Sequence, residues 1–128
     1  QVRKLAMASI LIIDDSEIIR SLLSDYLSEK GHRVDHAVNG AEGIERALAK
    51  DYHLVFCDIH MPKKNGYETY KAVRAQKPWL PFIMTDSLPD YLAEAATQHG
   101  ASACLTKPFD LDQVSALLDT LLRPEHQP

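Results

Sequence analysis

ILIIDDSE, residues 10–17, is the most informative segment for the architecture of this chain. Four aliphatic residues run directly into Asp14 and Asp15, and Ser16 follows as a plausible helix N-cap. A short apolar run without polar alternation is typical of a strand covered on both faces, as in a parallel sheet. Two like charges at the end of such a strand are unfavourable unless a positive group offsets them. The stretch therefore predicts a buried strand that ends beside a cationic partner.

The same alternation of short apolar runs and amphipathic segments continues along the chain. Strands are expected over residues 9–13, 33–38, 53–57, 80–85 and 102–106. Helices are expected over residues 16–31, 41–50, 66–77, 88–100 and 111–122. Strands that alternate with helices indicate right-handed crossovers between parallel strands. We therefore predict a doubly wound α/β fold with a five-stranded parallel sheet and five helices on its two faces.

Length and composition favour one globular domain over residues 1–128, with a core at about 9–122 and flanking tails at 1–8 and 123–128. The C-terminal tail is polar and expected to fray. A net charge of −4 gives no sign of a nucleic-acid-binding surface. No apolar run approaches the roughly 18 residues of a membrane span. Cys57 and Cys104 lie in apolar runs, which predicts free, buried thiols in a reducing, cytoplasmic compartment.

Several polar residues are expected to meet at one edge of the sheet. In such sheets, ligands bind beyond the carboxyl ends of the strands. Five residues lie at or just past a strand's last residue: Asp14, Asp15, Asp58, Thr85 and Lys107. Three adjacent carboxylates cannot all stay ionised without a large penalty, and Mg²⁺ binds few carboxylates together with waters and phosphate oxygens. The pattern therefore predicts a magnesium site.

Three segments together resemble the receiver domain of two-component response regulators: ILIIDDSE (10–17), LVFCDIHMPKKNG (54–66) and TKPF (106–109). The resemblance covers about residues 9–122. It implies the flavodoxin-like strand order 2-1-3-4-5. It also implies a signalling domain, not an enzyme for external substrates, that takes a phosphoryl group from a sensor histidine kinase or a phosphotransfer protein.

The resemblance implies a role for each candidate residue. Asp58 would accept the phosphoryl group as a nucleophile. Asp14, Asp15 and Asp58 would bind Mg²⁺ together with the backbone carbonyl of His60.

The phosphoryl oxygens would have protein partners of their own. By the same resemblance, Thr85 would contact the phosphoryl group and Lys107 would neutralise it. A cis peptide bond is implied between Lys107 and Pro108.

Two residues depart from the pattern of the family. Asp86 follows Thr85, where the family has a small residue, and its carboxylate would repel a phosphoryl group unless it turned to solvent. The run 80–85 also looks one residue short, which leaves Asp86 and Ser87 as other occupants of the Thr85 position. Cys104 stands where the family often has a Tyr or Phe that swings inward on activation. Output by another route, or weak output, is therefore expected.

The loop after Asp58 has features of its own. His60 lies at the rim of the site, where it either tunes dephosphorylation or has no role. Pro62 is expected to stiffen the loop, and the Asn65-Gly66 pair is expected to permit a positive φ before the next helix.

Two other functions remain open at this stage. A degenerate receiver would bind partners constitutively without phosphorylation. A Mg²⁺-dependent phosphohydrolase would need a second catalytic acid two residues after Asp58, where His60 stands, and a cap for which 128 residues leave no room. A kinase is expected to dock near Asp58 beside Arg20 and Ser24, and the face of the fourth helix, fifth strand and fifth helix could support a homodimer.

Overall fold

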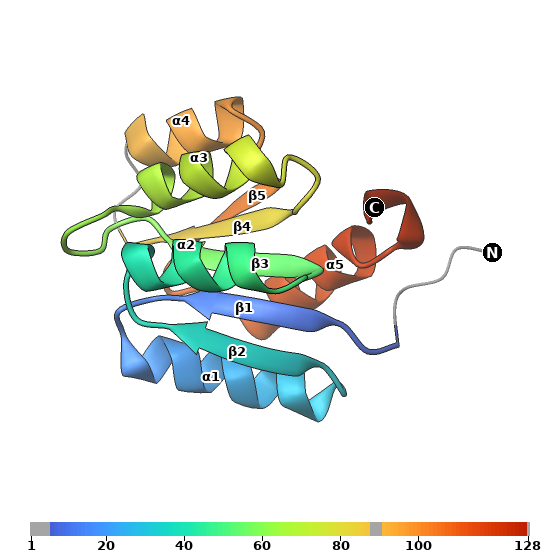
Figure 1. Ribbon diagram of the computed structural model, residues 1–128. Helices are drawn as coiled ribbons and strands as arrows, with labels where there is room; N and C mark the ends of the chain where they lie inside the picture. The colour runs from blue at the N-terminus through green and yellow to red at the C-terminus, as the bar shows by residue number, and fades with distance from the viewer. Residues whose placement is uncertain (1–5, 88–90, 128) are drawn as a thin grey trace.

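The computed structural model describes residues 6–87 and 91–127. Its centre is a five-stranded parallel sheet in the order β2-β1-β3-β4-β5 (Figure 1). The strands are β1 (Ser9–Ile13), β2 (Arg33–Ala37), β3 (Leu54–Asp58), β4 (Phe82–Asp86) and β5 (Ala103–Thr106). The predicted fold class and strand order are confirmed.

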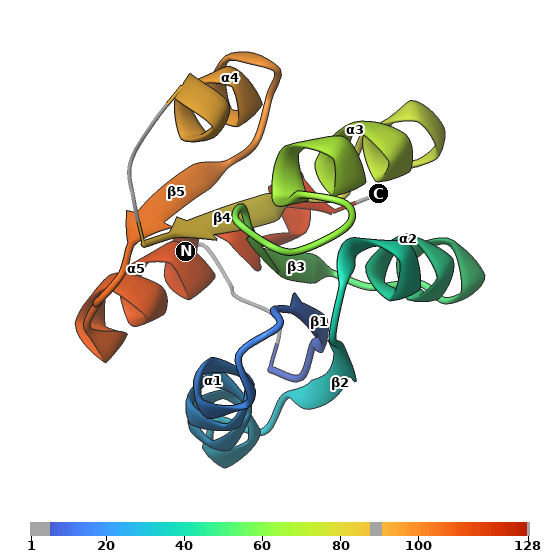
Figure 2. The same cartoon turned by 90° about the vertical axis from the view of Figure 1, so that its left-hand side faces the viewer.

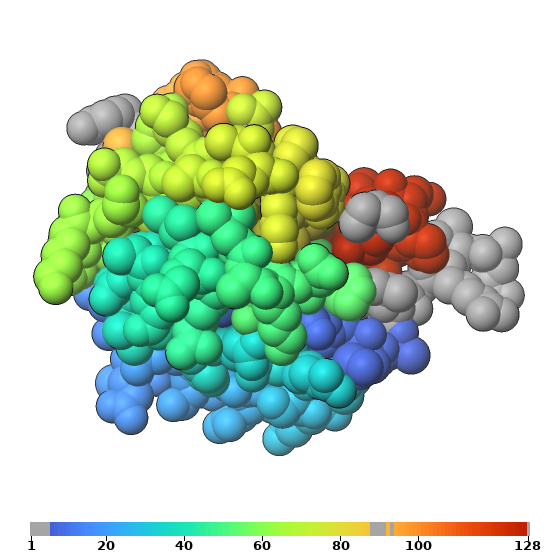
Figure 3. All heavy atoms as spheres, viewed as in Figure 1, coloured from blue at the N-terminus to red at the C-terminus, as the bar shows by residue number. Residues whose placement is uncertain are grey.

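Five helices connect and cover these strands. They are α1 (Glu17–Glu29), α2 (Gly40–Ala49), α3 (Gly66–Gln76), α4 (Tyr91–Gln98) and α5 (Leu111–Leu121). Seen along the strands, α1 and α5 lie on one face of the sheet and α2, α3 and α4 lie on the other (Figure 2). In the space-filling view, the side chains of α2 and α3 meet over the sheet (Figure 3).

The sheet separates two apolar cores, because successive side chains of a strand point to opposite faces. Ile10 and Ile12 of β1 pack in the core under α1 and α5. Leu11 and Ile13 pack in the core under α2, α3 and α4. All four are fully buried, which explains why the strand is apolar without alternation.

The ends of the elements differ from expectation by a few residues. Ser16 caps α1 as predicted, since its side chain accepts a hydrogen bond from the Ile19 backbone N–H, and Gly31 follows the helix with a φ of 92°. Asp58 and Asp86 are the last residues of β3 and β4, not the first residues after them. The expected start of the fourth helix at 88–90 lies outside the described residues.

The C-terminal tail does not fray over its described part. Pro124–His126 form a short 3₁₀ turn, and the Gln127 side-chain amide donates hydrogen bonds to the carbonyls of His53 and Leu121 at 3.1 and 3.0 Å. The prediction of a frayed tail is therefore wrong for these residues, because Gln127 finds two carbonyl partners.

Two smaller predictions concern the cysteines and the membrane. Both cysteines are free, Cys57 fully buried and Cys104 half-buried. Across residues 6–87 and 91–127, none of the helices has the length and apolar character that crossing a membrane requires.

Candidate functional site

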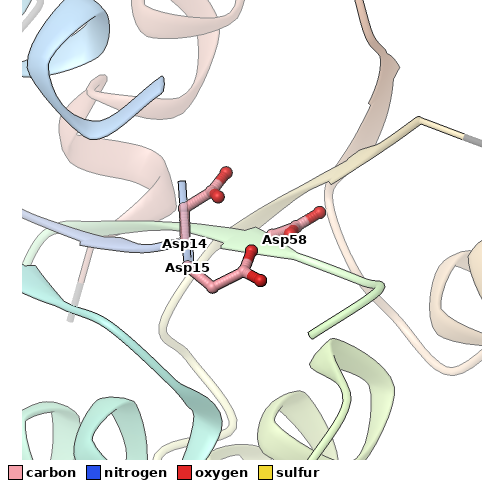
Figure 4. A group of neighbouring side chains, drawn as sticks. All are labelled: Asp14, Asp15 and Asp58. Atoms are coloured by element: carbon pink, nitrogen blue, oxygen red, sulfur yellow. The ribbon is translucent and has the colours of Figure 1, made fainter. Parts of the chain in front are cut away.

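Three carboxylates gather at the carboxyl ends of β1 and β3 (Figure 4). Asp14, Asp15 and Asp58 each offer one oxygen, and these oxygens all lie within 4.8 Å of one another. Asp14 and Asp58 are buried, while Asp15 is exposed to solvent. The structure thus brings together the three side chains that the sequence proposed as metal ligands, and one side of the cluster is open to an incoming ion.

Asp14 is held by hydrogen bonds to the end of β2 and to the start of α1. Its backbone N–H donates to the Ala37 carbonyl of β2, and its Oδ1 accepts from the Ser16 N–H at 2.8 Å. The Arg20 guanidinium donates to its carbonyl at 2.7 Å. The start of α1 therefore holds Asp14 in one orientation, in which its Oδ2 faces Lys107.

Lys107 is the cation that faces the cluster. Its Nζ lies 2.9 Å from Asp14 Oδ2 and 3.3 Å from Asp58 Oδ1, and its side chain is 13% exposed. Burial disfavours the ammonium, but the hydrogen bond and charge of Asp14, followed by those of Asp58, raise the pKa of Lys107. Its peptide bond to Pro108 is cis, as the resemblance implied.

One lysine does not balance the carboxylates. Burial and the neighbouring charge of Asp14 raise the pKa of Asp58 from 3.8 to about 7, although Lys107 acts in the opposite direction. The site therefore carries uncompensated negative charge when Asp58 is ionised. A set of clustered carboxylate oxygens with open solvent access suits Mg²⁺, a hard cation that prefers oxygen ligands and retains several waters.

Thr85 lies directly opposite Asp58 in the register of β3 and β4. Residues paired in this way point to the same face of the sheet. Thr85 is buried, and among the described residues its hydroxyl has no hydrogen-bond partner. A buried hydroxyl without a partner costs free energy, which a ligand bound at Asp58 would recover. The geometry thus favours Thr85 over Asp86 and Ser87 for this position.

Comparison with known proteins decides the family. The family model described as "Response regulator receiver domain" matches residues 10–119. This chain belongs to the response regulator receiver domain family.

One curated relative is longer than this receiver domain. Response regulator ArlR of Staphylococcus aureus is 30% identical over 121 residues, which are 94% of this chain and 55% of ArlR. The chain thus spans about half the length of the curated relatives it matches.

Two solved structures are similar across most of the chain. Response regulator TrrA of Thermotoga maritima, crystallised in complex with Mg²⁺-BeF, has 31% identity and a TM-score of 0.82, covering 89% of this chain and 98% of TrrA. Chemotaxis protein CheY4 of Vibrio cholerae has 31% identity and a TM-score of 0.83, covering 91% and 100%.

Asp86 does not turn to solvent. It is 0% exposed, and its Oδ1 lies 2.6 Å from Nδ1 of His60. Asp86 follows Thr85 in β4, so its side chain points to the opposite face of the sheet. The Asp86 carboxylate is therefore directed away from the face on which Asp58 and Thr85 lie, and it contacts His60.

The loop after Asp58 is shaped differently from expectation. The positive φ is at Lys63, at 70°, and not in the Asn65-Gly66 pair. Asn65 instead caps α3, accepting a hydrogen bond from the Glu68 N–H. Gly66 is needed for close approach, since a Cβ there would lie 2.2 Å from the Asp58 carbonyl oxygen. Gly66 therefore lets the start of α3 pack against the end of β3.

Proposed function

We propose that Asp58 of this receiver domain accepts a phosphoryl group with the help of Mg²⁺. Asp14, Asp15 and Asp58, together with the backbone carbonyl of His60, would hold the metal. The observation that supports this most strongly is the cluster of three carboxylate oxygens within 4.8 Å, with Lys107 beside two of them. The chain would act as one domain over residues 1–128, with its core at about 9–122.

The chemistry requires little from the protein beyond position and charge. An oxygen of ionised Asp58 attacks the phosphorus of a phosphohistidine, the P–N bond breaks, and the departing imidazole takes up a proton. Lys107 and the Thr85 hydroxyl contact phosphoryl oxygens and stabilise their charge. Bound Mg²⁺ supplies further positive charge to these oxygens. Because Asp58 is a carboxylate, it needs no general base.

The phosphodonor would be a sensor histidine kinase or a phosphotransfer protein. Docking beside α1 near Arg20 and dimerisation through α4, β5 and α5 remain predictions. A cytoplasmic location is part of the same proposal, and it is supported by the free thiols of Cys57 and Cys104. Half-buried Cys104 packs against the core where an aromatic side chain is common in the family, so the route of output is also a prediction.

The two other functions have no comparable support. A degenerate receiver is disfavoured because the acidic cluster, Lys107 and the Thr85 hydroxyl are all in place. A phosphohydrolase is disfavoured because His60, at the position of the second acid, has its Nδ1 engaged by Asp86.

Purified protein incubated with Mg²⁺ and a small phosphodonor such as acetyl phosphate should gain the mass of one phosphate. The gain is expected because nucleophile, metal ligands and charge-stabilising groups lie in one site. Intact-mass spectrometry measures it, and a matched sample with EDTA should gain nothing. An unmodified protein under saturating donor and Mg²⁺ would support the degenerate receiver, and sustained release of inorganic phosphate from an external phosphate ester would support the phosphohydrolase.

A further inference from the structure

We propose that Asp86 is a positioning residue for the metal site, acting through its hydrogen bond to His60. The bond would hold the loop after Asp58 in the conformation that binds Mg²⁺. This inference rests on the proposed function and adds to it a role for the residue that departs most clearly from the pattern of the family.

The first support is the contact itself. His60 Nδ1 and Asp86 Oδ1 are 2.6 Å apart, and the Asp86 side chain is 1% exposed. A carboxylate only accepts hydrogen bonds, so Nδ1 of His60 carries the donated proton. The carboxylate end of this bond is buried and so has no competing water, whereas the His60 side chain is 37% exposed. The pair therefore links the loop directly to the end of β4.

The second support is the hydrogen bond between the Asp86 backbone and Lys107. The Asp86 backbone carbonyl accepts a 2.6 Å hydrogen bond from the Lys107 N–H, and Asp86 is the last residue of β4. Lys107 faces Asp58 from the position just after β5. Asp86 thus contacts Lys107 through its backbone carbonyl and His60 through its side chain. Both contacts are made from the last residue of β4.

The third support is the position of His60. It lies two residues after Asp58, and its carbonyl is the proposed fourth protein ligand. Ile59 is already fixed on both sides, since its N–H donates to the Thr85 carbonyl and its carbonyl accepts from the Gly66 N–H. The side chain of His60 adds an anchor one residue further along the loop. Partners that orient a ligand in this way commonly affect metal affinity without touching the metal.

A purely electrostatic role of Asp86 predicts a different result. If Asp86 served only as a nearby negative charge, His60→Ala would keep that charge and remove the imidazole, and Mg²⁺ would bind equally or more tightly. If Asp86 positions the loop, the same variant removes the anchor and Mg²⁺ binds more weakly. The two interpretations therefore differ in whether His60→Ala weakens Mg²⁺ binding.

The test measures Mg²⁺ affinity of the whole chain by isothermal titration calorimetry. His60→Ala and Asp86→Ala should each weaken Mg²⁺ binding roughly tenfold, and the double variant should be no worse than either single one. Asp86→Asn should keep most of the affinity, because its amide oxygen still accepts from Nδ1. Unchanged or tighter Mg²⁺ binding by His60→Ala, or an Asn variant as weak as Asp86→Ala, would overturn the proposal.

A matched control separates this effect from general destabilisation. Tyr52 donates a hydrogen bond of the same 2.6 Å length to Asp35, near the amino end of β3 and away from Asp58. Asp35→Ala should lower the melting temperature and leave Mg²⁺ affinity unchanged. If Asp86→Ala does not fold, His60→Ala, which changes a partly exposed side chain, carries the test. Wild-type protein that binds no Mg²⁺ would contradict the proposed function itself, not the role of Asp86.

Discussion

Asp58→Asn will abolish phosphorylation and, in the absence of Mg²⁺, will stabilise the fold at about pH 8. The amide cannot act as the nucleophile, so the mass gain seen with a small phosphodonor and Mg²⁺ should disappear completely. The stabilisation has a separate cause, because Asn also removes a buried charge next to Asp14.

The sign of the pH effect follows from the pKa of Asp58. Folding raises this pKa from 3.8 to about 7, so the folded state holds the proton more tightly than the unfolded state. The wild-type free energy of unfolding should therefore fall as pH rises from about 4 to about 7, and stay low above that. The asparagine variant should lack this decrease and exceed the wild type at pH 8 by roughly 1–3 kcal/mol.

Urea denaturation at several pH values, with EDTA and with Mg²⁺, measures this difference. Saturating Mg²⁺ should remove the advantage of Asp58→Asn, because the variant has lost a ligand. Asp51→Asn is the matched control, since Asp51 is fully exposed and should change neither phosphorylation nor the pH profile. Phosphorylation of Asp58→Asn, or a variant less stable than wild type at every pH, would contradict the assignment.

Lys107→Met will slow phosphorylation by about 100- to 1,000-fold, the usual effect of removing one charge-stabilising donor from a reaction site. Methionine keeps an unbranched apolar stem and removes the ammonium, which lies within 3.3 Å of both Asp14 and Asp58. The same change should strengthen Mg²⁺ binding, because the metal no longer competes with a fixed cation for these oxygens.

A stopped-flow or mass-based rate at saturating Mg²⁺ and a calorimetric Mg²⁺ titration measure the two effects. Lys30→Met, at the exposed C-terminal end of α1, is a control that should affect neither. A slower rate accompanied by weaker Mg²⁺ binding would indicate a collapsed site, and an unchanged rate would exclude Lys107 from the chemistry.

The sequence predicted the architecture well because the three central strands, β1, β3 and β4, are short and almost entirely buried. Ile10 to Ile13 are apolar on both faces, and this pattern has few interpretations other than a central parallel strand. The ends of the strands were harder to predict, because Asp58 and Asp86 are polar residues within the ladder. Hydrophobicity alone ends a strand before such residues, although backbone pairing carries it one residue further.

The sequence predicted the part of the candidate site that is formed by residues at the carboxyl ends of the strands. It did not predict the contact that a side chain of the loop after Asp58 makes with β4. Asp14, Asp15, Asp58 and Lys107 do meet as expected. The His60–Asp86 contact was not anticipated, since it depends on the register that pairs Asp58 with Thr85. Because successive side chains of β4 alternate between the two faces of the sheet, Asp86 points away from the face of Thr85 and toward the loop after Asp58.

The role of Gly66 was missed for a related reason. A sequence shows that Gly can adopt positive φ, but it does not show that the Asp58 carbonyl occupies the space of a Cβ. Only the packing of α3 against β3 reveals this close approach.

The most direct test of the central claim is a crystal structure of this receiver domain grown with Mg²⁺ and beryllofluoride, a stable analogue of a phosphoryl group. Beryllium should be bonded to an Asp58 carboxylate oxygen, with Mg²⁺ ligated by the acidic cluster and both Lys107 and Thr85 in contact with fluorine. Phosphoryl transfer to Asp58 with Mg²⁺ would be contradicted if the acidic cluster held neither metal nor beryllofluoride at saturating concentrations and Lys107 remained paired to Asp14 and Asp58.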